Sequence, residues 1–499
     1  MRALQLVPAA AVLVALGTIG GVAQWSHPAA PGPGIVTSGR PVTVTTVTRA
    51  CPPAVGTGSG RVALIGAAAA TTAAGKAGQA ELTPLSPAGV QLRTVAPISQ
   101  AGPGVLSLVS VPAASTTGKK ATPVQVGWSV TATGAMATAM EAEVAQSSGL
   151  ASVRCSAPGS DLWFAGPGQD NGAGQIQLDL MNVDALPATV NVSVITDAGQ
   201  VLAGNDTGII VPPHQMVTES LSSVAAGSTV FAIHVRTTVG RVAADVLEGP
   251  SHGALSSWLP SAASASTRQV IPGVPPSSKP AELFLAVPGN ADARVSVLAI
   301  TPQGQYRPFE GQTIDLPGQS ATSQALSPLG GTAAALELTS NVPVVAAVLV
   351  PGSGLGNFTT SAAAISQQAV VAGNVAGSGL TATVVLSAPA GAARVRLTAI
   401  AGGGGAGGAG AGAQSQGAQS RVVLISAAHT LVVSVSPPPG AKRGSAYAIV
   451  ITPLAGSGPV YAARVEQSQS SVVSIVPAVS ALTTIDLPPV RDSYDADSS

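Results

Sequence analysis

Short runs in which apolar and polar residues alternate recur along most of the chain, as in IQLDLM (176–181), TVNVSVIT (189–196) and RVRLTAI (394–400). Clusters of glycine, proline and asparagine separate these runs. Successive side chains of a β-strand point to opposite faces of a sheet, so the alternation predicts strands with one buried face, and the clusters predict turns. The pattern as a whole therefore predicts an all-β protein.

A longer repeat is superimposed on this alternation. Three stretches that begin near residues 161, 268 and 368 resemble one another, and in each an apolar pair precedes Ala-Gly or Pro-Gly. The period suits one immunoglobulin-like antiparallel β-sandwich per repeat, and each repeat is expected to end in a closing hairpin. A β-propeller with two blades per long repeat is the alternative. The coinciding glycines are Gly166, Gly273 and Gly373, which are 107 and 100 residues apart.

The pattern divides the chain into a leader, a linker, a row of four tandem β units and a tail. The first unit has diverged most, and its stretch MATAMEAEVAQ (136–146) fits either a strand of a hairpin or a helix, because alanine, methionine and glutamate form helices well. A glycine-rich stretch of the last unit predicts a flexible insertion in a hairpin loop. The predicted boundaries are 1–23 for the leader, 24–40 for the linker, 41–155, 156–260, 261–366 and 367–485 for the units, 401–420 for the glycine-rich loop and 486–499 for a disordered acidic tail.

The first residues predict a segment that enters a membrane. Arg2 is followed by an almost wholly apolar run over residues 3–23, about the length of a membrane-spanning helix. The run is long for a signal peptide, and Gly21-Val22-Ala23 is a weak cleavage site, so an uncleaved anchor and a cleaved signal peptide both remain open. Either reading places the rest of the chain outside the cytoplasm, secreted or anchored.

The chain has only two cysteines, Cys51 and Cys155. An even count in an exported chain predicts a disulfide, and the alternative is two separate thiols. The loop that such a disulfide would close is about a hundred residues long, a length at which the chain-entropy model gives several kcal/mol of stabilisation.

Aromatic residues make up only 3% of the chain, yet Trp163 and Phe164 are adjacent. The other units carry valine and isoleucine at these positions. A core-facing pair exchanges readily with aliphatic residues because burial is its contribution, so we expect both rings to lie in the core. The alternative is a ligand-binding patch, for which the candidate ligand-facing aromatics are Trp163, Trp258 and Tyr306.

The charges and motifs favour neither nucleic-acid binding nor catalysis. The chain has 22 basic and 22 acidic residues and no basic stripe, so no nucleic-acid partner is expected. The five histidines are scattered, and the glycines at 402–407 are not placed to open a helix of a βαβ unit, so we expect no metal and no cofactor. No nucleophile elbow occurs, and no catalytic residue is expected. The candidates for a carboxylate pair are expected to be solvated side chains at strand edges: Asp161, Asp170, Asp179, Glu141 and Glu143.

The arrangement at 161–250 resembles tandem units of about a hundred residues found in many secreted bacterial proteins. The whole chain, with its leader, Cys51-Pro52 and Cys155, resembles an uncharacterised actinobacterial family of secreted or membrane-anchored proteins of unknown function. The likeness covers roughly residues 41–480. The third and fourth units depart from the pattern by carrying valine in place of tryptophan. The resemblance implies tandem β repeats and no activity, so it carries over no catalytic residue.

These observations predict a non-enzymatic, extracytoplasmic structural or interaction protein of the cell envelope. Its expected partners are the membrane, through the N-terminal segment, and a cell-wall glycan or other envelope proteins. Two alternatives remain: a module that binds a carbohydrate or wall polymer, and a hydrolase of unrecognised type whose catalytic residues come together from distant segments.

Overall fold

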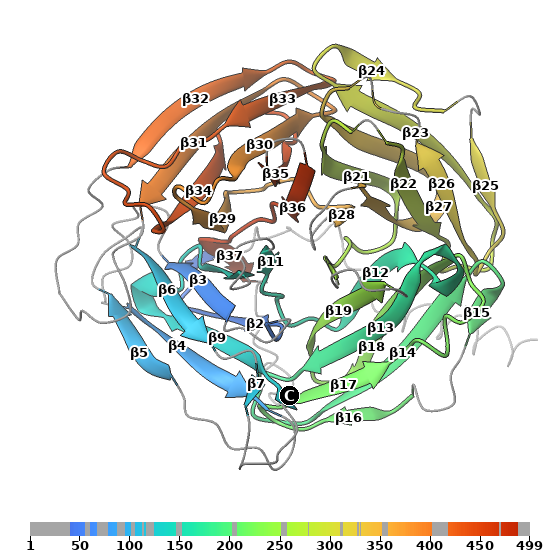
Figure 1. Cartoon of the computed structure of the whole chain (residues 1–499), viewed down its shortest axis with the longest axis horizontal. Coiled ribbons are helices and arrows are strands. Elements are labelled where there is room, and N and C mark those ends of the chain that lie inside the picture. Colours follow the sequence, from blue (N-terminus) through green and yellow to red (C-terminus); the bar gives the residue numbers. More distant parts are fainter. Residues whose placement is uncertain are drawn as a thin grey trace, which may run out of the picture. The chain divides into compact units, whose positions relative to one another are not determined.

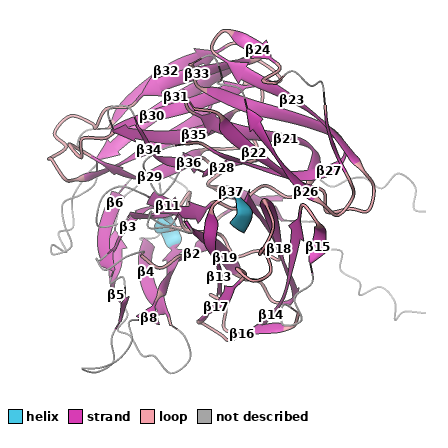
Figure 2. Ribbon diagram, turned by 45° about the vertical axis from the view of Figure 1, so that its right-hand side comes forward, coloured by secondary structure: helices cyan, strands magenta, loops and turns pink. Residues whose placement is uncertain are grey.

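The structure is a computed structural model of the chain. Its described residues form β-strands and two short 3₁₀ turns, η1 and η2, so the predicted all-β fold is confirmed (Figures 1 and 2). No helix among them is long and apolar enough to cross a membrane. The leader at 1–23 and all of the predicted linker except Arg40 lie outside the described residues. These residues are 40–54, 60–66, 78–86, 95–100, 105–111, 114–115, 124–145, 152–201, 207–250, 257–277, 279–309, 313–326, 329, 331–351, 358–401, 418–468 and 471–487.

The chain divides into two compact units. Residues Thr43–Thr484 form one, and residues Met1–Val42 and Ile485–Ser499 form the other. Strands β1 (Arg40–Thr43) and β37 (Thr484–Leu487) pair with each other. Strand β37 includes the first two residues of the predicted disordered tail, and residues 488–499 lie outside the described residues.

The strands of the larger unit fall into four consecutive segments, which we number in chain order. Segment 1 contains β2 (Thr46–Cys51), β3 (Gly60–Gly66), β4 (Gly78–Leu85), β5 (Val95–Gln100), β6 (Val105–Val111), β7 (Ala114–Ser115), β8 (Val124–Gln125), β9 (Gly127–Thr133), η1 (Gly134–Met136), β10 (Glu141–Ala145) and β11 (Ser152–Arg154). Segment 2 contains β12 (Asp161–Pro167), η2 (Gln169–Asn171), β13 (Ala173–Met181), β14 (Ala188–Thr196), β15 (Gly199–Val201), β16 (Ile209–Val211), β17 (Met216–Ser220), β18 (Val230–Val239), β19 (Ala243–Pro250) and β20 (Ser257–Leu259).

Segments 3 and 4 continue in the same way. Segment 3 contains β21 (Ser266–Val274), β22 (Ala281–Ala286), β23 (Ala293–Thr301), β24 (Gly304–Tyr306), β25 (Ile314–Leu316), β26 (Ala321–Leu326), β27 (Ala334–Leu349) and β28 (Phe358–Thr360). Segment 4 contains β29 (Ala369–Val375), β30 (Thr381–Ala388), β31 (Ala393–Ala401), β32 (Gln419–Ile425), β33 (His429–Ser434), β34 (Ala446–Pro453), β35 (Tyr461–Ser468) and β36 (Ser471–Pro477).

Each segment builds two antiparallel sheets with the same strand order. In segment 4 the sheets are β29-β34-β31-β32 and β33-β30-β35-β36, and in segment 2 they are β12-β18-β14-β15 and β17-β13-β19-β20. In segment 3 the long strand β27 passes through both sheets and joins them. Successive strands of a segment thus mostly alternate between two sheets, whereas a propeller blade is a single four-stranded sheet. The two-sheet architecture is therefore the observed one, and the described strands form no closed propeller.

The predicted closing hairpins are wrong. In segment 4, β34 and β35 belong to different sheets, and β18 and β19 of segment 2 do likewise. Both strands of each pair lie where the sequence pattern predicts strands. The alternation shows only that a strand has a buried face, and it does not show which sheet the strand joins. In segment 1 the described part of this stretch, 136–145, contains the end of η1 and strand β10 and no α-helix. The hairpin interpretation of β31 and β32 is correct, because they pair from Ala393↔Ile425 to Ala399↔Gln419, on either side of residues 402–417, which lie outside the described residues.

The four segments do not form an open row. Apolar clusters join segment 1 to segment 2, segment 2 to segment 3, and segment 3 to segment 4. A further cluster joins segment 4 back to segment 1, with Val370 and Ala448 packed against Ala63 and Ile65. Figure 1 shows the sheets of the larger unit following one another in this order. The first and last segments are therefore in contact, although segments 2 and 3 lie between them in the sequence.

The aligned glycines lie in strands β12, β21 and β29, and two of them lie at the junctions between segments. A Cβ atom at Gly273 (φ +76°) would lie 2.2 Å from Cβ of Ala463 in segment 4. A Cβ atom at Gly373 would lie 2.5 Å from Oε2 of Glu143 in segment 1. The repeated glycine thus permits the close approach of one segment to the next.

Candidate functional site

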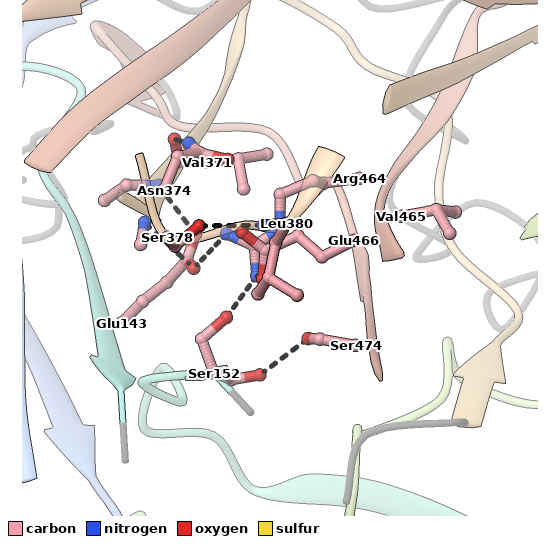
Figure 3. Close-up of polar contacts among 12 residues, drawn as sticks. Glu143, Ser152, Val371, Asn374, Ser378, Leu380, Arg464, Val465, Glu466 and Ser474 are labelled. Atoms are coloured by element: carbon pink, nitrogen blue, oxygen red, sulfur yellow. Dashed lines mark hydrogen bonds and ion pairs between the residues drawn. The ribbon is translucent and has the colours of Figure 1, made fainter. Parts of the chain in front are cut away.

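A cluster of charged side chains is buried where segment 1 meets segment 4 (Figure 3). Strand β10 contributes Glu143, and strand β35 contributes Arg464 and Glu466. Their exposed fractions are 0%, 0% and 6%, respectively. Charged residues are almost never buried to this extent unless they are paired, so the contacts of each group decide what the cluster does.

Glu143 binds the backbone of segment 4. Its Oε1 accepts a hydrogen bond from the amide of Ala372 (2.7 Å), and its Oε2 accepts one from the amide of Gly373 (3.1 Å). A bulge between Val371 and Asn374 frees these amides from the ladder with β34. The carboxylate of one segment therefore satisfies donors that the bulge of the other leaves unpaired.

Arg464 holds the centre of the cluster. Its Nη1 donates to Oε2 of Glu143 (3.1 Å), and its Nη2 lies 3.8 Å from Oε2 of Glu466 and also donates to the hydroxyl of Ser152 on β11. Burial lowers the pKa of Arg464, but the two carboxylates outweigh this effect and raise the pKa above its ordinary value. Burial raises the pKa of Glu466, although Arg464 opposes that shift.

Glu141 extends the cluster within segment 1. Its carboxylate pairs with Arg154, and its Oε1 lies 3.9 Å from Nε of Arg49. Burial is the main cause of the lowered pKa of Arg49. The cluster thus combines three carboxylates with three guanidinium groups, so its formal charges balance. A balanced, buried cluster of this kind positions segments, because each carboxylate pairs with a guanidinium group, although Nε of Arg464 and Nη1 of Arg154 have no hydrogen-bond partner among the described residues.

A second buried polar group lies in segment 2, where Asp179 and Asp245 are directly opposite each other on β13 and β19. Oδ1 of Asp179 accepts hydrogen bonds from Thr218 (2.8 Å) and Gln177 (3.0 Å), and Oδ1 of Asp245 accepts one from Ser156 (2.7 Å). Neither Oδ2 atom has a partner among the described residues. Burial raises the pKa of Asp179 to about 6, and burial together with the neighbouring Asp179 raises the pKa of Asp245 well above its ordinary value.

These raised pKa values predict greater stability in mild acid. These two carboxyl groups bind protons more tightly in the folded state than in the unfolded state. The stabilisation that they give is therefore fully present below their ordinary pKa, near 3.8. It is lost as the pH rises through about 6 for Asp179 and through a higher pH for Asp245. We expect the free energy of unfolding to be greater at about pH 5 than at about pH 8, by at least about 1 kcal/mol from Asp179 alone. Urea unfolding at both pH values measures this difference.

The matched variants for this prediction are Asp179→Asn with Asp245→Asn, which removes both carboxyl groups, and Asp170→Asn at an exposed position. The double variant should lose the part of the difference that Asp179 and Asp245 contribute and keep the part that comes from Glu248, whose pKa burial raises to about 7, and Asp170→Asn should keep the whole difference. An unchanged difference in the double variant would assign the pH dependence to other groups.

The Trp163 ring stacks on the imidazole of His234, with centroids 3.9 Å apart and planes 5° from parallel. Nε2 of His234 lies 2.9 Å from Oδ1 of Asp161, and burial lowers the pKa of the imidazole. Ser193 is the cross-strand neighbour of His234 on β14, but no hydrogen bond joins them. The described residues here show a histidine held by an indole and a carboxylate, without an activated nucleophile.

The residues singled out from the sequence lie in different environments in the structure. Cys51 and Cys155 form the predicted disulfide. Trp163 is 4% exposed and lies in the core, as expected, and Trp258 is 5% exposed. Tyr306 is 39% exposed, so of the three candidate ligand-facing aromatics only this one offers its ring to solvent.

The expectation that the candidate acids are solvated is wrong for three of them. Asp179, Glu141 and Glu143 are all 0% exposed, whereas Asp161 and Asp170 are exposed. Arg464 was missed altogether. The available signal was the alignment of the closing strands, in which Glu143 and Asp245 occupy the position held by Ala347 and Ala463 in segments 3 and 4. An acid where related strands carry alanine indicates a buried and compensated charge.

The described residues contain no group of three or more histidine, cysteine or acidic side chains placed to hold a metal ion. No curated protein and no solved structure matches the chain. The model of a family of unknown function, DUF5719, matches residues 110–435, more than half of the 499 residues, and the chain belongs to this family.

Proposed function

We propose that this protein is a non-enzymatic structural or interaction protein of the cell envelope, whose β body lies outside the cytoplasm. The Cys51–Cys155 disulfide carries the proposal, because disulfides form and persist in oxidising compartments and are rare in the cytosol. Both cysteines are buried, at 0% and 1% exposure, as in a bond that serves the fold.

The use of the buried charges supports a structural role. Glu143, Arg464 and Ser152 connect the first and last segments, and Asp245 binds Ser156 in the stretch that joins segments 1 and 2. Here the ion-paired groups face one another, which favours a rigid body that presents its outer surface.

We propose that the four segments are tandem immunoglobulin-like repeats of about a hundred residues each, within a secreted or membrane-anchored actinobacterial family. Residues 1–23 would direct the chain to the membrane. The envelope partners would be wall polymers or other proteins that contact the outer faces of the sheets. Carbohydrate stacking has little support, because Trp163 and Trp258 are buried.

The compartment can be tested by labelling intact cells. Ala455→Cys places a thiol in an exposed turn between β34 and β35. A membrane-impermeant maleimide should label this variant in intact cells to the same extent as after lysis, because the body lies outside the cytoplasmic membrane. The wild-type chain, with its buried disulfide, is the matched control and should stay unlabelled in both. Labelling of the variant only after lysis would contradict the proposed location.

A further inference from the structure

One cross-strand pair in each segment faces a neighbouring segment, and its chemistry changes from junction to junction. In segments 3 and 4 the pair is apolar and belongs to a cluster that is shared with the preceding segment. In segment 2 both members are aspartates, and Met181 and Ala243 beside them pack against Ala50 and Leu85 of segment 1. The four pairs, in the order of the segments, are Ala63–Glu143, Asp179–Asp245, Phe284–Ala347 and Val385–Ala463.

The two aspartates differ from Glu143 in the charge that surrounds them. Glu143 is matched by Arg464 of the neighbouring segment. Among the described residues, no ion pair joins Asp179 or Asp245 to a lysine, arginine or histidine. The Oδ2 atom of each aspartate is buried and has no hydrogen-bond partner in this part of the chain, and the two residues are 0% and 2% exposed. When both groups are ionised, they present two negative charges and two free oxygens that no described residue balances.

Neutral oxygen atoms lie around the pair. The hydroxyl of Thr218 is 2.8 Å from Oδ1 of Asp179, and the hydroxyl of Ser156 is 2.7 Å from Oδ1 of Asp245. Nε2 of Gln177 is 3.0 Å from Oδ1 of Asp179, and a half-turn of this amide would bring its Oε1 to the same place. Carboxylate, hydroxyl and amide oxygens are ligands that hard cations prefer in proteins.

The pair lies between a fixed part of segment 1 and the solvent. Ser156 follows the disulfide-bonded Cys155, and its backbone is hydrogen-bonded to Ala50 in both directions. Nε2 of Gln177 also donates to Oε1 of the exposed Gln125 (3.0 Å). The disulfide end of segment 1 thus holds one hydroxyl against the pair, and the two glutamines border it on the side from which a hydrated ion can enter.

We propose that Asp179 and Asp245 bind one calcium ion at the junction of segments 1 and 2. One divalent cation balances both negative charges, whereas a monovalent cation leaves one of them unbalanced. Calcium accepts irregular sets of about six to eight oxygen ligands, which the side chains of this junction and water can supply together. Magnesium requires a near-ideal octahedron and gives up its water reluctantly, so it fits this site less well.

The calcium site deepens the proposed structural role, because the ion ties segment 2 to Ser156 of segment 1. It rests on the proposed extracytoplasmic location only for a supply of millimolar calcium. Binding by the purified chain is measured without cells, so its failure and the failure of the labelling experiment are separate results.

Equilibrium dialysis of the purified full chain against radioactive calcium chloride tests the proposal. At about pH 8 and about 150 mM NaCl, where attraction to exposed charges is screened, we expect one ion per chain. The dissociation constant should be about 0.1–1 mM, as in extracellular calcium modules, and magnesium should compete at least about tenfold less well. A chain that binds no calcium up to about 10 mM would overturn the proposal, and so would equal competition by magnesium.

Paired variants locate the ion. Asp179→Asn with Asp245→Asn should abolish binding in this range of concentration. The control, Asp170→Asn with Asp197→Asn, makes the same change in net charge at exposed positions of segment 2 and should bind calcium like the wild type. Circular dichroism checks that both variants are folded. Calcium binding that persists in the first variant would overturn the proposal, because other groups would then hold the ion.

Stability and acid give two further measurements. Calcium should raise the thermal midpoint of the wild type and of the control at about pH 8, because a ligand of the folded chain stabilises it, and should leave the Asp179→Asn, Asp245→Asn variant unchanged. At about pH 5 the raised pKa of Asp179, about 6, leaves this group mostly protonated, so calcium should bind at least about tenfold more weakly. An equal rise of the midpoint in that variant, or binding that acid does not weaken, would overturn the proposal. A chelator in the urea experiments described above keeps their pH difference that of the calcium-free chain.

Discussion

Arg464→Met is expected to lower the free energy of unfolding of the larger unit by about 3–5 kcal/mol, because it leaves Glu143 and Glu466 buried without their cation. Denaturant unfolding, followed by circular dichroism and by tryptophan fluorescence, measures the loss. Agreement between the two signals shows that the unit unfolds as a whole. The expected loss is a large fraction of the total stability of a typical domain.

Two further variants make this first prediction specific. Arg294→Met removes an arginine from an exposed pair with Asp315 and should cost no more than about 1 kcal/mol. Arg464→Met combined with Glu143→Gln and Glu466→Gln should recover a good part of the loss, because no uncompensated charge remains. A loss in Arg464→Met as small as that in Arg294→Met would mean that the buried cluster does not hold the two segments together.

Removal of the disulfide is the second large effect. Cys51→Ala with Cys155→Ala releases a loop whose ends are 104 residues apart, and the chain-entropy model gives about 4–5 kcal/mol for such a loop. The same unfolding measurement applies, with and without a reductant. The reductant should lower the wild-type midpoint toward that of the double variant and should leave the variant unchanged. A wild-type midpoint that does not respond to complete reduction would contradict this expectation.

The sequence was sufficient to predict the features that depend on a short stretch of the chain or on the chemistry of single residues. Alternation located strands such as β14, β23 and β31, and the exchange of Trp163 for aliphatic residues in the other units indicated its place in the core. The even cysteine count predicted the disulfide. Each of these inferences uses a property that a residue has because of its near neighbours or its chemistry.

The relations between distant segments could not be derived in the same way. Period-two alternation is identical whether a strand pairs with the one before it or joins the other sheet, so it predicts a hairpin for β34 and β35, which in fact lie in different sheets. The burial of Glu143 depends on a bulge and a guanidinium that lie more than two hundred residues further along the chain.

The contact between the first and last segments has a consequence for biogenesis. Glu143 meets Arg464 across a separation of 321 residues, so the first segment to leave the ribosome cannot complete its packing until the last one is available. Contacts this far apart in sequence are slow to form, and incomplete chains expose strand edges and apolar faces in the meantime. A nascent or exported chain would thus need protection from aggregation for nearly its whole length. A fragment ending before β35 would carry Glu143 without Arg464 and be a natural substrate for quality-control proteases.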